Sequence, residues 1–139
     1  MVKEIYSLGT SNRSQDAFLR IIKKFHIQRI VDVRRFPTSK FLHFKASNLK
    51  KILNQENVEY VYMGDILGGY RKEGYRNYLQ TQAFSSGLRK LEKLALEKRT
   101  CILCCERFYF RCHRRFITEA LRGNFKVIHI IEEDRVKQE

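Results

Sequence analysis

Short apolar runs rich in β-branched residues alternate along this chain with longer segments whose apolar residues recur three or four positions apart. The short runs predict β-strands, and the longer segments predict amphipathic helices. Strands are expected at residues 5–8, 30–33, 58–63, 100–105 and 125–131. Helices are expected at residues 15–25, 47–54, 82–98 and 113–121. This alternation predicts an α/β fold, a single domain with a mainly parallel five-stranded sheet and helices on both faces.

The segments outside this pattern add no second domain. Ser14 is placed to cap the first predicted helix. A glycine-containing loop is expected over residues 64–75, and residues 132–139 are expected to be a polar tail. We therefore treat residues 1–139 as one domain.

Composition narrows the class of protein. Hydrophobic residues make up 43% of the chain and aromatic residues 12%, as is typical of globular proteins. The sequence has no apolar run long enough for a membrane span and no apolar signal segment at its start. We therefore expect a cytoplasmic protein with no membrane partner. Its four cysteines are expected to be thiols, ligands or nucleophiles in preference to disulfides, and a disulfide between Cys104 and Cys112 is the open alternative.

Basic residues outnumber acidic ones, 28 to 15, and give a net charge of +13. The excess is concentrated between Val33 and Gln55, a stretch without any acid. Its basic residues are Arg34, Arg35, Lys40, Lys45, Lys50 and Lys51, and Phe36, Phe41, His43 and Phe44 lie among them. Interleaved cations and aromatic rings favour a nucleotide or nucleic acid as partner. The alternative is a solvated basic face with no ligand.

Unusual polar residues follow four of the five predicted strands. Because the carboxyl ends of parallel strands meet at one edge of the sheet, where ligands bind in such folds, these residues are expected to form one site. The candidate ligand-binding residues are Ser7, Gly9, Ser11, Arg13, Asp32, Arg34, Gly68, Gly69 and Arg114. The candidate catalytic residues are Cys104, Glu106, Cys112 and His113.

Each residue type indicates a role. Arg13, Arg34 and Arg114 are expected to hold an anion. Glu106 is a candidate general base or orienting carboxylate, and His113 a candidate proton shuttle or hydrogen-bond donor at a helix start. Cys104 and Cys112 are expected to be thiols that face the site. The remaining cluster members have two interpretations each: the carboxylate of the second strand is either half of a structural ion pair or an acid–base group, and the glycines either admit a ligand or form turns.

The cysteine spacing argues against a metal module. Cys101 and Cys104 are three positions apart on one predicted strand, so their side chains point to opposite faces and Cys101 is expected in the core. Cys104 or Cys105 could form a metal site together with Cys112 and His113. The sequence has no second Cys/His pair at the spacing of a zinc module, so we expect no metal and no other cofactor.

Another pattern supports a different chemistry. Cys105-x5-Arg111 formally matches the thiolate loop of cysteine phosphatases and sulfurtransferases. The five residues between them include bulky aromatic residues and no glycine, which makes a tight loop of backbone N–H groups difficult to form. A cysteine-dependent enzyme is therefore an alternative to a nucleotide site.

Several motifs in the same order resemble the DUF488 family of small prokaryotic proteins of unassigned function. They are Ser7-x-Gly9-x-Ser11-x-Arg13, Asp32-Val33-Arg34-x-x-Pro37, Leu67-Gly68-Gly69, Cys104-x-Glu106 and Cys112-His113-Arg114. The family usually has His where Thr10 stands here and a small residue where Cys105 stands. The resemblance implies a family and no established activity.

The leading hypothesis is an anion-binding site at the strand carboxyl ends, for a nucleotide or nucleic acid on which it could also act. The alternatives are a cysteine-dependent sulfurtransferase or phosphatase, and a non-catalytic module that binds nucleic acid through its basic surface.

Overall fold

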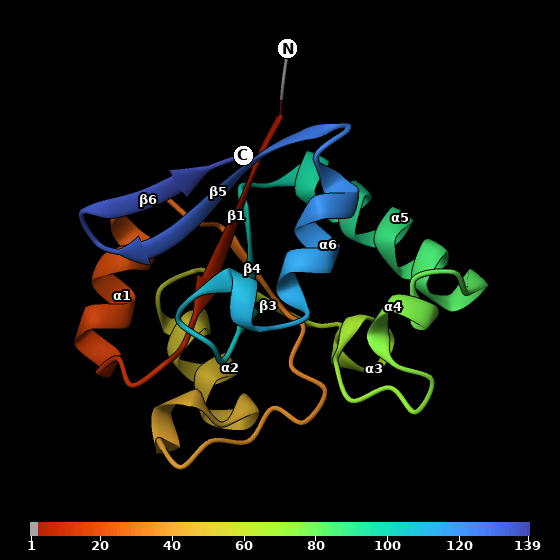
Figure 1. Cartoon of the computed structure of the whole chain (residues 1–139). Coiled ribbons are helices and arrows are strands. Elements are labelled where there is room, and N and C mark those ends of the chain that lie inside the picture. The colour runs from red at the N-terminus through yellow and green to blue at the C-terminus, as the bar shows by residue number, and fades with distance from the viewer. Residues whose placement is uncertain (1–2) are drawn as a thin grey trace.

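Six strands form one sheet in the order β3-β2-β4-β1-β5-β6. The structure is a computed structural model that describes residues 3–139 (Figure 1). The strands are β1 (Lys3–Gly9), β2 (Arg29–Asp32), β3 (Glu59–Tyr62), β4 (Thr100–Cys104), β5 (Phe125–Glu132) and β6 (Arg135–Gln138). The first five pair in parallel, which confirms the α/β class and the mainly parallel sheet.

The sixth strand corrects the predicted five-stranded sheet and its polar tail. Strand β6 turns back from β5 and pairs with it antiparallel. All four of its residues are exposed, so no buried face produces the apolar alternation that identifies a strand in a sequence. Its pairing with β5 places it at the sheet edge.

Four longer helices cover the sheet: α1 (Gln15–Lys24), α2 (Ala46–Gln55), α5 (Gln82–Glu97) and α6 (Arg114–Leu121). The expected loop at 64–75 instead contains α3 (Gly64–Leu67) and the start of α4 (Tyr75–Tyr78), each too short for helical periodicity to reveal. Single 3₁₀ turns, η1 (Leu42–Phe44) and η2 (Tyr109–Arg111), complete the elements. Across residues 3–139, no helix has the length and apolar character needed to cross a membrane.

The two faces of the sheet have separate cores. Phe18 of α1 and Leu49 of α2 pack on the face that carries Cys101, whereas Leu91 of α5 and Ile117 of α6 pack on the face that carries Cys104. The two cysteines therefore lie on opposite faces, as their spacing predicts. Each core contains fully buried branched side chains, whose removal from water stabilises the fold.

This topology determines where a ligand can enter. Strands β1 and β2 lead into α1 and α2 on one face, and β3 and β4 lead toward α5 and α6 on the other. Strand β4 lies between β2 and β1, so the connection that leaves it diverges from both neighbours. Divergence of this kind opens a crevice at the carboxyl ends of the strands.

Candidate functional site

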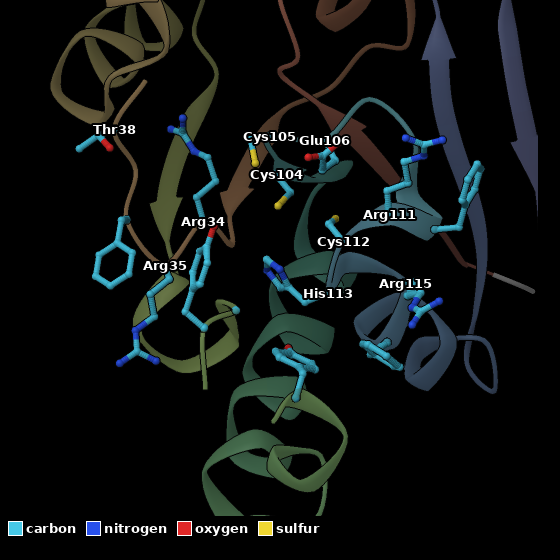
Figure 2. Close-up of a pocket in the computed structure, with 16 residues that line it drawn as sticks. Arg34, Arg35, Thr38, Cys104, Cys105, Glu106, Arg111, Cys112, His113 and Arg115 are labelled. Atoms are coloured by element: carbon cyan, nitrogen blue, oxygen red, sulfur yellow. The ribbon is translucent and has the colours of Figure 1, made fainter. Parts of the chain in front are cut away.

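A pocket of about 720 Å³ lies at the carboxyl ends of β2, β3 and β4 (Figure 2). The loops after these strands and the first turn of α6 form its wall. Its lining residues are Arg34, Arg35, Phe36, Thr38, Gly69, Tyr70, Tyr75, Cys104, Cys105, Glu106, Phe110, Arg111, Cys112, His113, Arg115 and Phe116. All four candidate catalytic residues are among them, together with the candidate ligand-binding residues Arg34 and Gly69.

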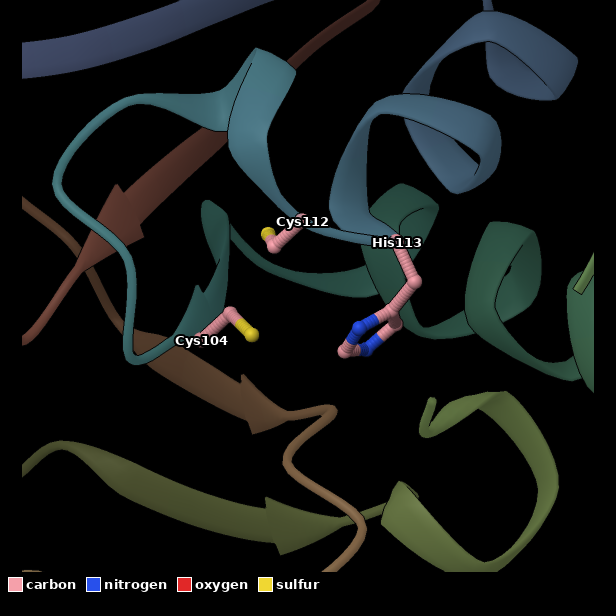
Figure 3. A group of neighbouring side chains, drawn as sticks. All are labelled: Cys104, Cys112 and His113. Carbon is pink, nitrogen blue, oxygen red and sulfur yellow. The ribbon is translucent and has the colours of Figure 1, made fainter. Parts of the chain in front are cut away.

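Three of the four candidate catalytic residues form a tight cluster. The Sγ atoms of Cys104 and Cys112 and a ring nitrogen of His113 all lie within 4.8 Å of one another (Figure 3). Cys104 is the last residue of β4 and is buried, while Cys112 and His113 are half-buried just before α6. The fold thus joins the end of a central strand to the start of the following helix.

The three thiols at the pocket differ in pKa because of their contacts with one another. Hydrogen bonds with Cys105 and Cys112, together with burial, raise the pKa of Cys104 well above its ordinary value. The hydrogen bond with Cys104 lowers the pKa of the exposed Cys105 to about 6. The same Cys104 contact, assisted by the positive charge of Arg114, lowers the pKa of Cys112. Cys101, by contrast, has its pKa raised to about 12 by burial alone in the core.

His113 is held as a neutral imidazole. Its Nε2 lies 2.9 Å from the carbonyl oxygen of Val33. A carbonyl can only accept, so Nε2 carries the proton and Nδ1 has the lone pair. Burial lowers the pKa of His113, and the charges of Arg114 and Arg71 lower it further. At neutral pH the ring is therefore a base or a ligand.

Asp32 and Arg34 form a buried ion pair beside the pocket. Asp32 is fully buried; Arg34 donates to its carboxylate through Nε at 2.8 Å and Nη2 at 2.7 Å, and through Nη1 to the carbonyl of Phe44 at 2.7 Å. Tyr60 donates its hydroxyl to the same carboxylate at 2.6 Å. Although burial disfavours the charge, these contacts to Asp32 raise the pKa of Arg34. The pair has the geometry of the structural alternative, and most of the Arg34 fork is occupied.

Arg13 lies away from the pocket. It is buried, and its guanidinium donates to the carbonyls of Gly9 at 2.9 Å and Ile131 at 2.6 Å. It thereby connects the ends of β1 and β5. Burial lowers the pKa of Arg13, and the nearby charge of Arg107 adds to the effect.

Arg114 lies beneath the loop that follows β4. Its side chain is 1% exposed, and Nη2 donates to the carbonyl of Glu106 at 2.9 Å. Its Nε and Nη1 have no hydrogen-bond partner among the described residues. Arg114 is absent from the pocket lining, so it supports the loop from behind.

The other candidate ligand-binding residues lie outside the pocket wall or in close backbone packing. Ser7 is buried and hydrogen-bonded to Nδ1 of His129 at 2.6 Å. Ser11 accepts a hydrogen bond from Arg107. A Cβ at Gly9 would lie 1.7 Å from the Glu106 carbonyl oxygen, so this glycine admits the loop after β4.

The glycine pair after β3 is divided between two environments. A Cβ at Gly68 would lie 2.2 Å from the Gly64 carbonyl oxygen, which makes Gly68 necessary for packing. Gly69 lines the pocket, and a Cβ there would lie 3.1 Å from Nδ1 of His113.

Sequence reasoning did not single out Arg115 and Phe116, which line the pocket from the first turn of α6. The available signal was their position. Residues in the first turn of a helix that follows a parallel strand lie at the same edge as the end of that strand. The arginines that reach the pocket are therefore largely different from those expected to hold an anion.

A comparison with curated proteins gave no match. A comparison with family models matched the domain of unknown function DUF488 over residues 14–121, which is more than half of the chain. The matched part contains the loops after β2, β3 and β4 and therefore every residue of the pocket wall. The chain belongs to the DUF488 family.

Proposed function

We propose that the pocket binds an anionic ligand with a planar base, namely a nucleotide or a nucleotide unit of a nucleic acid. The observation that carries the proposal is the composition of the pocket wall, in which unpaired arginines alternate with exposed aromatic rings. The cluster of thiols and His113 lies at the same wall, where it could act on such a ligand.

The arginines of the wall supply charge. Arg35, Arg111 and Arg115 line the pocket, and none of them forms an ion pair within residues 3–139. Glu106 is the sole acidic side chain of the wall. Guanidinium groups bind phosphate through two parallel hydrogen bonds, so this excess of positive charge favours a phosphorylated ligand.

The aromatic rings supply stacking surfaces. Phe36, Tyr70 and Phe110 line the pocket and are 63%, 85% and 52% exposed. Phe36 and Tyr70 lie 5.9 Å apart between ring centroids. Exposed rings beside cations bind unstacked bases, and each stacked base contributes about 1–3 kcal/mol to the binding free energy.

A longer nucleic acid could extend beyond the pocket. Thr38 lines the pocket, and the chain continues from it to the exposed Lys40 and Lys45 and then to Lys50 and Lys51 of α2. These four lysines are the part of the basic stretch from Val33 to Gln55 that lies outside the pocket, and that stretch is the basic surface of the non-catalytic alternative. A mononucleotide would fill the pocket alone, whereas an oligonucleotide would also contact this surface.

The test measures the affinity of mononucleotides and of labelled single- and double-stranded DNA and RNA. We expect the double variant Arg111→Ala/Arg115→Ala to lose at least about tenfold in affinity, equivalent to about 1.4 kcal/mol. Arg89→Ala is the control, because Arg89 is an exposed arginine of α5 that does not line the pocket.

Equal losses in the double variant and in a doubly neutralised control, Arg89→Ala/Lys90→Ala, would reduce the effect to net charge and overturn the proposal. Absence of binding by the wild type at low salt would also overturn it.

A second candidate function is cysteine-dependent group transfer. Cys105 and Arg111, the two ends of the Cys105-x5-Arg111 pattern, both line the pocket, and both are exposed. Phosphatase and sulfurtransferase assays on the wild type and on Cys105→Ser test it. Turnover that survives in Cys105→Ser would exclude this residue as the nucleophile.

A further inference from the structure

We propose that Cys104, Cys112 and His113 form a zinc site whose open coordination position faces the pocket. The proposal does not depend on which ligand the pocket binds. It departs from the expectation of no metal, which depended on spacing along the chain, whereas the three ligand atoms are brought together by the fold.

The separation of the three groups suits a tetrahedral ion. All three ligand atoms lie within 4.8 Å of one another. Zinc–sulfur bonds of about 2.3 Å and zinc–nitrogen bonds of about 2.0 Å place tetrahedral ligands roughly 3.5–3.8 Å apart. The three atoms are therefore at most roughly 1 Å farther apart than the ligands of a bound zinc ion.

The imidazole already has the hydrogen bond that a metal ligand needs. Metal-bound histidines usually donate their second ring N–H to a carbonyl or carboxylate, which fixes the ring and its tautomer. Nε2 of His113 makes this contact with the Val33 carbonyl at 2.9 Å, and it leaves the lone pair on Nδ1. The missing side chain at Gly69 leaves space beside Nδ1.

One of the sulfur atoms also has a supporting contact. The backbone N–H of Arg114 donates to Sγ of Cys112 at 3.4 Å. Cys104 is held by its strand, where Leu103 and Gly9 flank it in the sheet. The backbone around Cys104 and Cys112 therefore orients both sulfur ligands, as in a preorganised site.

The donor set selects the metal and the type of site. Two thiolates and one imidazole favour zinc over the hard cations magnesium and calcium. Structural zinc sites use four protein ligands, whereas catalytic sites use three and keep the fourth position for water or substrate. All three residues line the pocket (Figure 2), so the fourth position would face its contents. Binding would displace the two thiol protons into solvent.

The experiment titrates the reduced, chelator-treated full chain with Co²⁺ and then with Zn²⁺, in the absence of any nucleotide. We expect one metal ion per chain, with the visible absorption of tetrahedral cobalt and a near-ultraviolet thiolate-to-cobalt band. Zn²⁺ should displace the cobalt. Cys104→Ser and Cys112→Ser should each weaken binding at least tenfold.

Cys105→Ser is the matched control, because Cys105 adjoins Cys104 but is exposed and not part of the cluster. Equal loss in Cys105→Ser, or no binding by the reduced wild type, would overturn the proposal. Circular dichroism identifies any variant that fails to fold, and His113→Gln then replaces it as the ligand variant. Arg111→Ala/Arg115→Ala should keep full metal affinity, so failure of the metal site and failure of the nucleotide site give different results.

Discussion

Four arginine side chains are buried: Arg13, Arg29, Arg34 and Arg114. Their burial and their partners do not follow from the sequence alone. From the sequence, an arginine at a strand end is expected to bind an anionic ligand. In the structure, Arg34 is paired with Asp32, and Arg13 and Arg114 donate to backbone carbonyls. A sequence shows the residue type and its distance from a strand, but not which carbonyl the guanidinium reaches. The arginines left for a ligand are those on the exposed side of the same loops.

Acid should destabilise the fold through His129. Burial lowers the pKa of this side chain from its usual 6.5 to about 4, so the unfolded chain binds a proton that the folded chain refuses. Stability is then fully present above pH 6.5 and is lost as the pH falls toward 4, by on the order of 3 kcal/mol. Urea unfolding at several pH values measures this loss.

The environment of His129 sets the control. Ser7 is hydrogen-bonded to its ring, Tyr109 stacks on it at 3.6 Å, and the Glu139 carboxylate lies 3.9 Å from Nε2. His129→Gln removes the titrating group, so its stability should depend less steeply on pH than that of the wild type. Identical pH dependence in both proteins would contradict this origin.

At the scale of elements, the sequence pattern was sufficient wherever an element had a buried face. The first five strands and the four longer helices follow from apolar periodicity, and Ser14 caps α1 by accepting from the N–H of Ala17 at 3.1 Å. Strand β6 has no buried face, and α3 and α4 are too short to show a helical period, so the apolar pattern does not predict these three elements. The alternation of strands and helices predicts at which edge of the sheet the pocket lies. It does not predict how the loops after β2, β3 and β4 contact one another at that edge.

The loop after β4 should depend on Gly9. A Cβ in Gly9→Ala would meet the backbone carbonyl oxygen of Glu106 at 1.7 Å, and neither backbone can yield without moving β1 or the loop. We expect a loss of at least about 2 kcal/mol in unfolding free energy, measured by denaturant titration.

Gly123→Ala is the control for this change. A Cβ there has no atom within 4 Å, and its φ is not in the left-handed region. It should therefore change stability by less than about 1 kcal/mol, while removing a glycine in the same way. Equal effects of the two substitutions would contradict the close approach at Gly9.

The whole molecule combines a net charge of +13 with a pocket at the edge of one sheet. A positive field attracts any polyanion, so affinity alone does not separate the pocket from the lysines of α2. The salt dependence of binding does, because each phosphate contact adds about 0.7–0.9 to the slope of log affinity against log salt.

Two double variants should therefore differ. Lys50→Ala/Lys51→Ala, on the exposed side of α2, should lower the oligonucleotide slope by about 1–2 and leave mononucleotide affinity unchanged. Arg111→Ala/Arg115→Ala should reduce both quantities. If the lysine variant alone abolished binding of every ligand, the non-catalytic basic surface would replace the pocket as the binding site.

We expect strand β6 to limit aggregation of the protein at high concentration. A sheet can grow by adding strands from neighbouring chains wherever its edge presents unpaired backbone groups, and exposed cations on that edge oppose such growth. Strand β6 pairs with β5 and places the exposed Arg135 and Lys137 at this edge, so the apolar β5 is shielded from other copies. The last strand of the sheet thus acts as a barrier to aggregation.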